Sequence, residues 1–153
     1  MTRKILFLCT GNTARSQMGE FILRKRAGSH FEVYSAGANP KEAVFPPVAE
    51  VMKEIGMDLT NARPKGVETF LGKVHFEKVF IVCADADKQC PHIFSAAQRV
   101  FWPFEDPAAA VGSRDEILAF CRKVRDQIDR KICEWLKEEG IEVQSIEEAS
   151  SNS

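Results

Sequence analysis

Short runs rich in hydrophobic, β-branched and aromatic residues alternate along the chain with segments in which hydrophobic residues recur every three or four positions. The runs are typical of buried strands, and the periodic segments are typical of helices with one buried face. The runs predict strands at 4–8, 31–35, 79–83 and 99–102. The periodic segments predict helices at 15–27, 46–55 and 115–139, and one or two helical turns at 67–71.

Helix boundaries support this division. Pro46-Pro47 suits the first turn of a helix, and Gly28, Gly56 and Gly140 follow the last periodic positions. Strands that alternate with helices predict an α/β fold with a small parallel sheet. The chain has 153 residues and shows no repeat or linker, so we expect one domain over 1–140 and a polar tail over 141–153.

The balance of charges argues against two classes of partner. Lys plus Arg (21) nearly equals Asp plus Glu (22), so the chain offers no broad field for nucleic acid or an acidic membrane, and we expect neither partner. The apolar run at 5–8 is too short for a signal-peptide core or a membrane span, which predicts a cytoplasmic protein. Any anion site must therefore be local.

The chain has five cysteines, an odd number without a CxxC pair, at positions 9, 83, 90, 121 and 133. In a reducing compartment such thiols are catalytic, redox-active or buried rather than a structural framework. Cys121 and Cys133 fall near apolar positions of the long helix, which favours packing. The three histidines show no metal-ligand spacing, so we expect no metal and no cofactor.

The stretch CTGNTARS, residues 9–16, joins the first strand to the first helix. Ligands of parallel sheets bind beyond the carboxyl ends of the strands, where loop amides and a helix N-terminus favour anions. Arg15 can form two hydrogen bonds with one oxyanion. The sequence predicts a site for a tetrahedral oxyanion, built from Thr10, Gly11, Asn12, Thr13, Ala14 and Arg15. Gly11 and Asn12 are residue types that tolerate positive φ.

Cys9 stands at the start of this loop and is the candidate nucleophile. A helix N-terminus and a nearby cation lower the pKa of a thiol, and the Ser16 hydroxyl can donate to the sulfur. The alternative is a buried cysteine followed by an ordinary strand-to-helix turn. A Walker phosphate loop is excluded because no Gly-Lys-Ser/Thr follows at the required spacing.

The loop resembles the CxxxxxR(S) loop of the low-molecular-weight protein tyrosine phosphatase family. With QMGE (17–20), YSAG (34–37), VCADADKQCP (82–91) and FWPFEDP (101–107), it is similar to the thioredoxin-coupled arsenate reductases built on that fold. The resemblance implies four parallel strands with helices on both faces. Gln17, where phosphatases usually carry proline, Ala108-Ala109, where they often carry tyrosines, and the additional Cys83 and Cys90 favour the reductase branch.

The resemblance implies roles for these residues. Cys9 forms a thiol–arsenate adduct, Cys83 attacks Cys9 to release arsenite, and Cys90 attacks Cys83 to leave a disulfide for thioredoxin. A continuous helix would separate positions 83 and 90 by about 10 Å, whereas a disulfide needs Cα atoms within about 7 Å, so we expect a conformational switch there. The alternative is that Cys83 is a core residue and Cys90 an incidental surface thiol.

The aspartate of the family's DP pair, Asp106 here, is implied to be the general acid; the alternative is a turn aspartate. Asn12, Glu20 and Ser35 match three positions of a potassium site found in some members, but Lys65 stands where those members have a carboxylate. An ammonium there can replace the ion electrostatically, so we do not predict bound potassium.

Three functions remain open. The leading one is an arsenate reductase that binds arsenate or a phosphate-like oxyanion and takes electrons from thioredoxin as a monomer. The second is a phosphomonoester phosphatase acting through Cys9, Arg15 and Asp106, an activity also expected as a weak side reaction of the reductase. The third is a non-catalytic oxyanion-binding or redox-sensing module, for which Asp106, Cys83 and Cys90 would be surplus.

Overall fold

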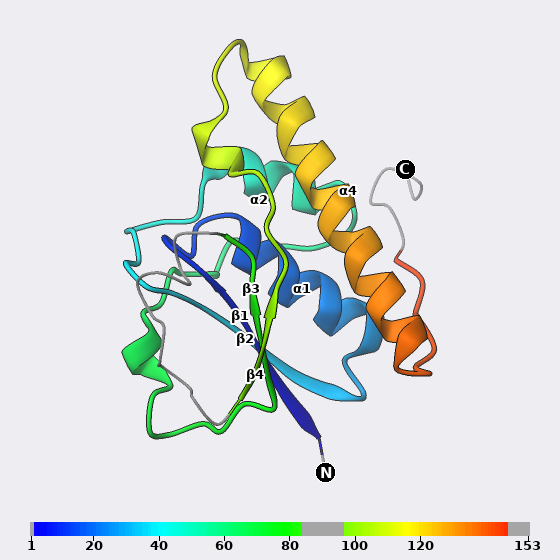
Figure 1. Ribbon diagram of the computed structural model, residues 1–153. Coiled ribbons are helices and arrows are strands. Elements are labelled where there is room, and N and C mark those ends of the chain that lie inside the picture. Colours follow the sequence, from blue (N-terminus) through cyan, green and yellow to red (C-terminus); the bar gives the residue numbers. More distant parts are fainter. Residues whose placement is uncertain (1, 84–96, 147–153) are drawn as a thin grey trace.

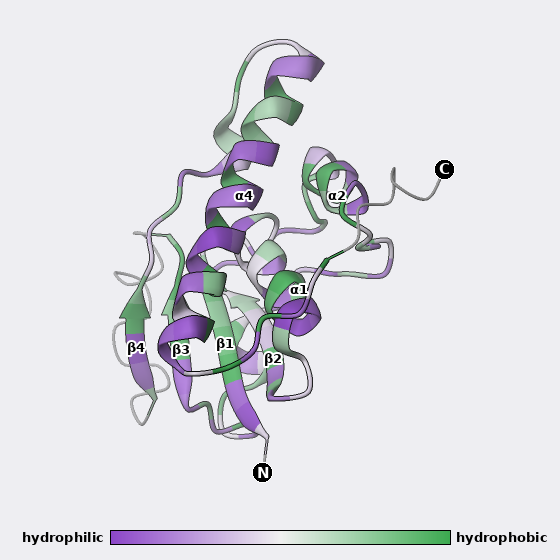
Figure 2. Cartoon of the chain, turned by 90° about the vertical axis from the view of Figure 1, so that its right-hand side faces the viewer, coloured by the Kyte–Doolittle hydropathy of each residue, from purple (hydrophilic) through white to green (hydrophobic). Residues whose placement is uncertain are grey.

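Four parallel strands form the centre of the computed structural model, which describes residues 2–83 and 97–146 (Figure 1). The strands are β1 (Arg3–Cys9), β2 (Phe31–Gly37), β3 (Lys78–Ile81) and β4 (Gln98–Phe101), in the order β2-β1-β3-β4. The predicted α/β class and four-stranded parallel sheet are confirmed. β1 lies between two neighbours, and Figure 2 shows its hydrophobic middle and polar start.

Within residues 2–83 and 97–146, three α-helices and two short 3-10 helices accompany the sheet. They are α1 (Arg15–Ala27), α2 (Pro46–Lys53), α4 (Arg114–Glu138), η1 (Val67–Thr69) and η2 (Pro107–Ala109). α2 ends two residues before its expected end at 55, and Gly56 follows with a φ of 81°. The helical turns expected at 67–71 form a single 3-10 turn.

One face of the sheet carries α1 and α4, which contact each other (Figure 1). Phe80 of β3 stacks on Phe7 of β1 and packs against Trp135 of α4. Gly19 brings α1 close to the sheet, because a Cβ there would lie 2.5 Å from the Phe7 ring.

Tyr34 of β2 lies on the opposite face of the sheet. Side chains alternate between the faces of a strand, so Tyr34 points away from its neighbours Val33 and Ser35. Its ring meets Phe70, which directly follows η1, and Phe76, so the segment that carries η1 covers this face. α1 and α4 therefore pack on one face of the sheet, and the η1 segment packs on the other face at β2.

Capping fixes the ends of α4. Ser113 and Glu116 form a reciprocal capping box at its start, and Gly140 follows its end with a φ of 74°. Beyond it, the Gln144 N–H donates to the Arg26 carbonyl at 2.8 Å, which ties residues 141–146 to α1. None of the described helices is long and apolar enough to cross a membrane.

The strand expected at 79–83 ends at Ile81. Val82 still donates to the Leu8 carbonyl, but its own carbonyl accepts from Phe104. The chain leaves the ladder there, and Cys83 lies just past the carboxyl end of β3. Because all four strands are parallel, their carboxyl ends meet at one edge, where the loops after β1, β2 and β4 come together.

Candidate active site

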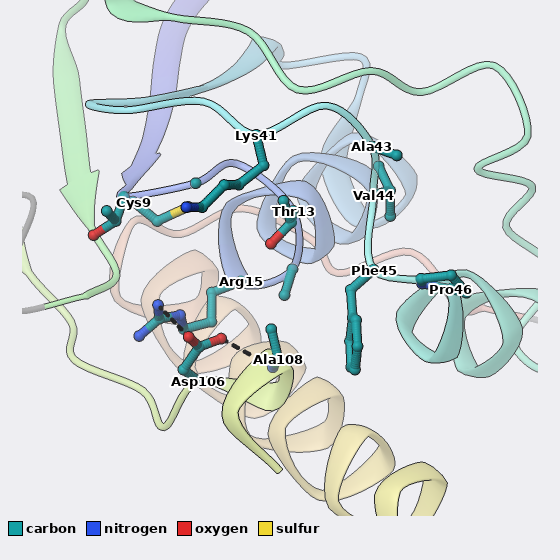
Figure 3. Close-up of a pocket in the computed structure, with 13 residues that line it drawn as sticks. Cys9, Thr13, Arg15, Lys41, Ala43, Val44, Phe45, Pro46, Asp106 and Ala108 are labelled. Atoms are coloured by element: carbon teal, nitrogen blue, oxygen red, sulfur yellow. Dashed lines mark hydrogen bonds and ion pairs between the residues drawn. The ribbon is translucent and has the colours of Figure 1, made fainter. Parts of the chain in front are cut away.

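The loop after β1 holds Cys9 and the first residue of α1 around one pocket (Figure 3). Thr10, Gly11, Thr13, Ala14 and Arg15 line it with Cys9. Asn12, also expected to bind the oxyanion, is fully buried and donates its N–H to the Cys9 sulfur at 3.2 Å.

Asn12 and Gly11 suit this loop for different reasons. Asn12 has a φ of 55°, as its residue type allows. The positive φ allowed for at Gly11 does not occur. Gly11 is suited to close approach, because a Cβ there would lie 3.1 Å from the Cγ of Lys41.

A directed chain of hydrogen bonds ends at the Cys9 sulfur. The Asn12 amide oxygen accepts from the Lys65 N–H at 2.8 Å and from Gln17 at 3.0 Å, which fixes the amide so that its nitrogen donates to the Ser16 oxygen at 2.7 Å. The Ser16 hydroxyl hydrogen is therefore directed toward the Cys9 sulfur, 2.7 Å from its oxygen. This arrangement stabilises a thiolate.

Burial acts against that thiolate. Cys9 is only 2% exposed, and burial raises the pKa of its thiol above the ordinary value. The hydrogen bond with Ser16 lowers the pKa, the nearby Cys83 raises it, and Asn12 lowers it. The lowered pKa expected from the sequence is thus not found, because the sequence does not show how completely the thiol is buried.

Arg15 and Asp106 meet across the pocket (Figure 3). The Arg15 guanidinium donates to the Phe104 carbonyl at 3.0 Å and lies 3.6 Å from an Asp106 carboxylate oxygen. Its Nε is buried and has no hydrogen-bond partner among the described residues, so within this part of the chain it retains a donor for a ligand. Asp106 has extended backbone before Pro107, and its other oxygen accepts from the Ala108 N–H at 3.0 Å. The aspartate thus caps η2 as a turn aspartate does and also faces the pocket.

Cys83 lies beside the same loop. Its sulfur is 3.2 Å from the Thr10 hydroxyl oxygen, and the residue is 2% exposed. Cys9, Cys83, Cys121 and Cys133 are all free thiols. Cys121 is buried within the core, whereas Cys133 is half-buried. Cys90 and the conformational switch expected between 83 and 90 lie outside the described residues.

Lys65 joins the cluster behind the loop. Its ammonium lies 3.4 Å from the Ser35 oxygen, 3.2 Å from the Arg63 carbonyl and 3.8 Å from Glu20, while Ser35 donates to Glu20 at 2.5 Å. Burial lowers the pKa of Lys65, and Glu20 opposes that effect. Among the described residues, no group of three or more His, Cys, Asp or Glu side chains is arranged to hold a metal ion.

The sequence interpretation missed the segment at 41–46, which forms the other side of the pocket. Lys41, Val44 and Phe45 line it, and the Phe45 N–H donates to the Thr13 carbonyl at 3.0 Å. Its place in the chain could have predicted this role, because the segment follows the carboxyl end of β2 at the same edge of the sheet.

A buried cysteine at the end of β1, an arginine six positions later and a facing aspartate share this pocket. The chain matches the family of low molecular weight phosphotyrosine protein phosphatases over residues 4–145 and belongs to it.

Several curated relatives of this chain are named arsenate reductase. The arsenate reductase of Bacillus subtilis (strain 168) is 36% identical over 136 residues, 88% of this chain and 96% of the relative. That of Halalkalibacterium halodurans is 39% identical over 133 residues, 86% of this chain and 94% of the relative. A solved structure described as "An arsenate reductase in the phosphate binding state" matches with a TM-score of 0.72 at 22% identity, covering 90% of this chain and 98% of that one. The last likeness shows the fold.

Proposed function

We propose that this chain is an arsenate reductase in which Cys9, Cys83 and Cys90 pass two electrons to arsenate. The observation that carries the proposal is the contact between the Thr10 hydroxyl and the Cys83 sulfur at 3.2 Å, because it places a second thiol against the loop of the first. The two curated relatives named above support the choice of arsenate.

The first step binds arsenate and forms the adduct. The loop amides and the Arg15 guanidinium hold three oxygens, and the Cys9 thiolate attacks arsenic. The fourth oxygen leaves as water after taking a proton from Asp106, 3.6 Å from Arg15. A sulfur–arsenic bond forms and an arsenic–oxygen bond breaks, while arsenic stays at the +5 state.

The second step transfers the electrons. The Cys83 thiolate attacks the Cys9 sulfur, a disulfide forms, and the electron pair of the sulfur–arsenic bond goes to arsenic, which leaves as arsenite. Cys90 then attacks Cys83 and releases the Cys9 thiolate. A dithiol reductant such as thioredoxin reduces the remaining Cys83–Cys90 disulfide. The cycle requires a reducing compartment such as the cytoplasm, and one copy of the chain supplies all three thiols.

A phosphatase is the second candidate. The family takes its name from that activity, and the facing Arg15 and Asp106 supply an anion ligand and an acid for an alcohol leaving group. The two candidates share the first attack and differ in the second: water completes hydrolysis, whereas Cys83 completes reduction.

The test measures both reactions on one sample. Arsenate-dependent NADPH oxidation is followed with thioredoxin and thioredoxin reductase, and p-nitrophenyl phosphate hydrolysis is followed in parallel. The proposal predicts rapid arsenate turnover and slow hydrolysis. Hydrolysis without arsenate turnover would make the protein a phosphatase, and phosphate binding without either reaction would leave an oxyanion-binding module.

A further inference from the structure

A second cation, Lys41, lies at the mouth of the pocket, on the segment that follows β2. Its backbone N–H donates to the Gly11 carbonyl at 3.1 Å. Two positions earlier, the Asn39 N–H donates to the Thr10 carbonyl at 2.8 Å. These bonds hold the Lys41 backbone alongside the loop that begins at Cys9, so the loop itself sets the position of the lysine.

The Lys41 side chain extends over the loop, with its ammonium toward Cys9 (Figure 3). Its stem lies on Gly11, where a Cβ would come within 3.1 Å of the Lys41 Cγ, so the glycine leaves room for the stem. Lys41 as a whole is exposed, and its charge therefore stays in contact with water. The ammonium is free to approach an anion held in the loop.

Lys41 differs from Arg15 in its charge partners. Among the described residues that line the pocket, the charged ones are Arg15, Lys41 and Asp106. Arg15 lies 3.6 Å from an Asp106 carboxylate oxygen, so part of its charge is already compensated. Within residues 2–83 and 97–146, no carboxylate forms an ion pair with Lys41. In this part of the chain, an anion can pair with Lys41 without displacing a carboxylate.

We propose that Lys41 is a second cationic ligand of the oxyanion, which pairs with an oxygen at the mouth of the pocket while the loop amides and Arg15 hold the others. The inference rests on the proposed oxyanion site. An ammonium is a compact charge on a flexible stem, which suits an ion that must enter and leave. Its attraction grows with the charge of the anion, so Lys41 favours doubly charged tetrahedral ions over singly charged ones.

The test compares two fully ionised tetrahedral anions, sulfate with two charges and perchlorate with one. Each is added at constant ionic strength and alkaline pH, and protection of Cys9 from iodoacetamide is read from the modified peptide by mass spectrometry. The anion concentration that halves the alkylation rate reports affinity, whatever the reactivity of the free thiol. This comparison gives the charge selectivity of the wild-type site.

Lys41→Met keeps an apolar stem against Gly11 and removes the charge. A unit charge about 4 Å away changes the affinity of a singly charged anion about fivefold in water, and it acts twice as strongly on a doubly charged one. Sulfate should therefore bind the variant about 25-fold more weakly, and perchlorate about fivefold more weakly. An equal loss for both anions, or a loss for neither, would overturn the inference.

Two further variants separate local charge from other effects. Lys41→Arg keeps the charge and should retain most of the wild-type selectivity, whereas a fall to the selectivity of Lys41→Met would contradict an electrostatic role. Lys53→Met removes an exposed lysine at the end of α2, outside the pocket, and should leave both affinities unchanged. A matching loss of selectivity in Lys53→Met would assign the effect to net charge and overturn the role of Lys41.

The same assay separates this inference from the proposed function because it requires no turnover. If sulfate fails to protect Cys9 in the wild-type protein, the oxyanion site itself is wrong and the role of Lys41 falls with it. If Lys41→Met loses selectivity but the wild-type protein does not reduce arsenate, the reductase proposal fails and the role of Lys41 stands. If arsenate is reduced and selectivity is unchanged in Lys41→Met, the role of Lys41 alone fails.

Discussion

Opposing influences meet on the sulfur of Cys9. Burial favours the neutral thiol, whereas Ser16 and the Asn12 N–H favour the thiolate. The hydrogen bonds are the part of this balance that a single substitution can remove.

Ser16→Ala should raise the pKa of Cys9 further, because the variant loses the hydroxyl that stabilises the thiolate. We expect Cys9 alkylation at neutral pH to slow several-fold and its pH profile to move toward alkaline pH. Peptide mass spectrometry after timed iodoacetamide labelling measures this. Ser29→Ala, at an exposed serine, is the control, and an unchanged profile in Ser16→Ala would contradict the role given to Ser16.

Lys65 supplies a fixed positive charge beside Glu20 and Ser35. Lys65→Asp should place oxygen-bearing side chains at all four positions of the cluster, 12, 20, 35 and 65. Potassium should then raise the Tm of the variant by about 2–4 °C over sodium at equal ionic strength. The wild-type protein and Lys65→Met should not distinguish the two ions. An equal potassium response in all three proteins would contradict the prediction that the Lys65 ammonium takes the place of a bound cation.

At the scale of elements, charged side chains join α2 to α4. Glu54, next to the end of α2, accepts from Arg122 at 2.8 Å and from the buried Arg125 at 2.9 Å. Arg125 also donates to the Val51 carbonyl at 2.8 Å. These contacts join the end of α2 to the middle of α4, two helices that follow the pocket-lining residues Phe45 and Ala108.

The hydrogen bond from Arg122 lowers the pKa of Glu54; burial opposes the shift and Arg125 adds to it. A lowered carboxyl pKa stabilises the fold above the unfolded-state pKa, and this contribution is lost as pH falls through the folded-state value. Glu54→Gln should therefore lower the Tm by about 2–4 °C at neutral pH, with the difference vanishing in acid. Thermal unfolding across pH tests this, with Glu42→Gln as control; a pH-independent difference would contradict the ionic origin.

At the scale of the whole molecule, the parallel sheet assembles the site. Cys9 ends β1, Cys83 and Asp106 come after β3 and β4, and parallel strands bring these carboxyl ends to one edge. The proposed relay draws on two of these loops and on Cys90.

Cys83→Ser and Cys90→Ser should each reduce steady-state arsenate turnover with thioredoxin by about a hundredfold or more, because each change removes one thiol–disulfide exchange step. With Cys90→Ser, one equivalent of arsenate should still yield arsenite and a Cys9–Cys83 disulfide, detectable by mass spectrometry. Cys121→Ser is the matched control at a buried thiol outside the relay. Unchanged turnover in both relay variants would refute the relay.

Local sequence determined much of this protein. The run at 5–8, the periodicity of 115–139 and the spacing from Cys9 to Arg15 are properties of neighbouring residues, and they gave the α/β class, the order of elements and the loop as the candidate site. Two element boundaries differ from the expectation: α2 ends at Lys53 rather than at position 55, and β3 ends at Ile81, after which the Val82 carbonyl accepts from the Phe104 N–H.

Only the tertiary structure decided the properties that depend on distant partners. Burial of Cys9 reverses the expected direction of its pKa, Lys65 reaches Glu20 across 45 positions, and Phe45 and Ala108 line one pocket from two separate segments. Desolvation, ion pairing and pocket walls arise between residues far apart in the chain. A sequence can show which residues are able to do chemistry, whereas the packed sheet fixes their surroundings and hence their energies.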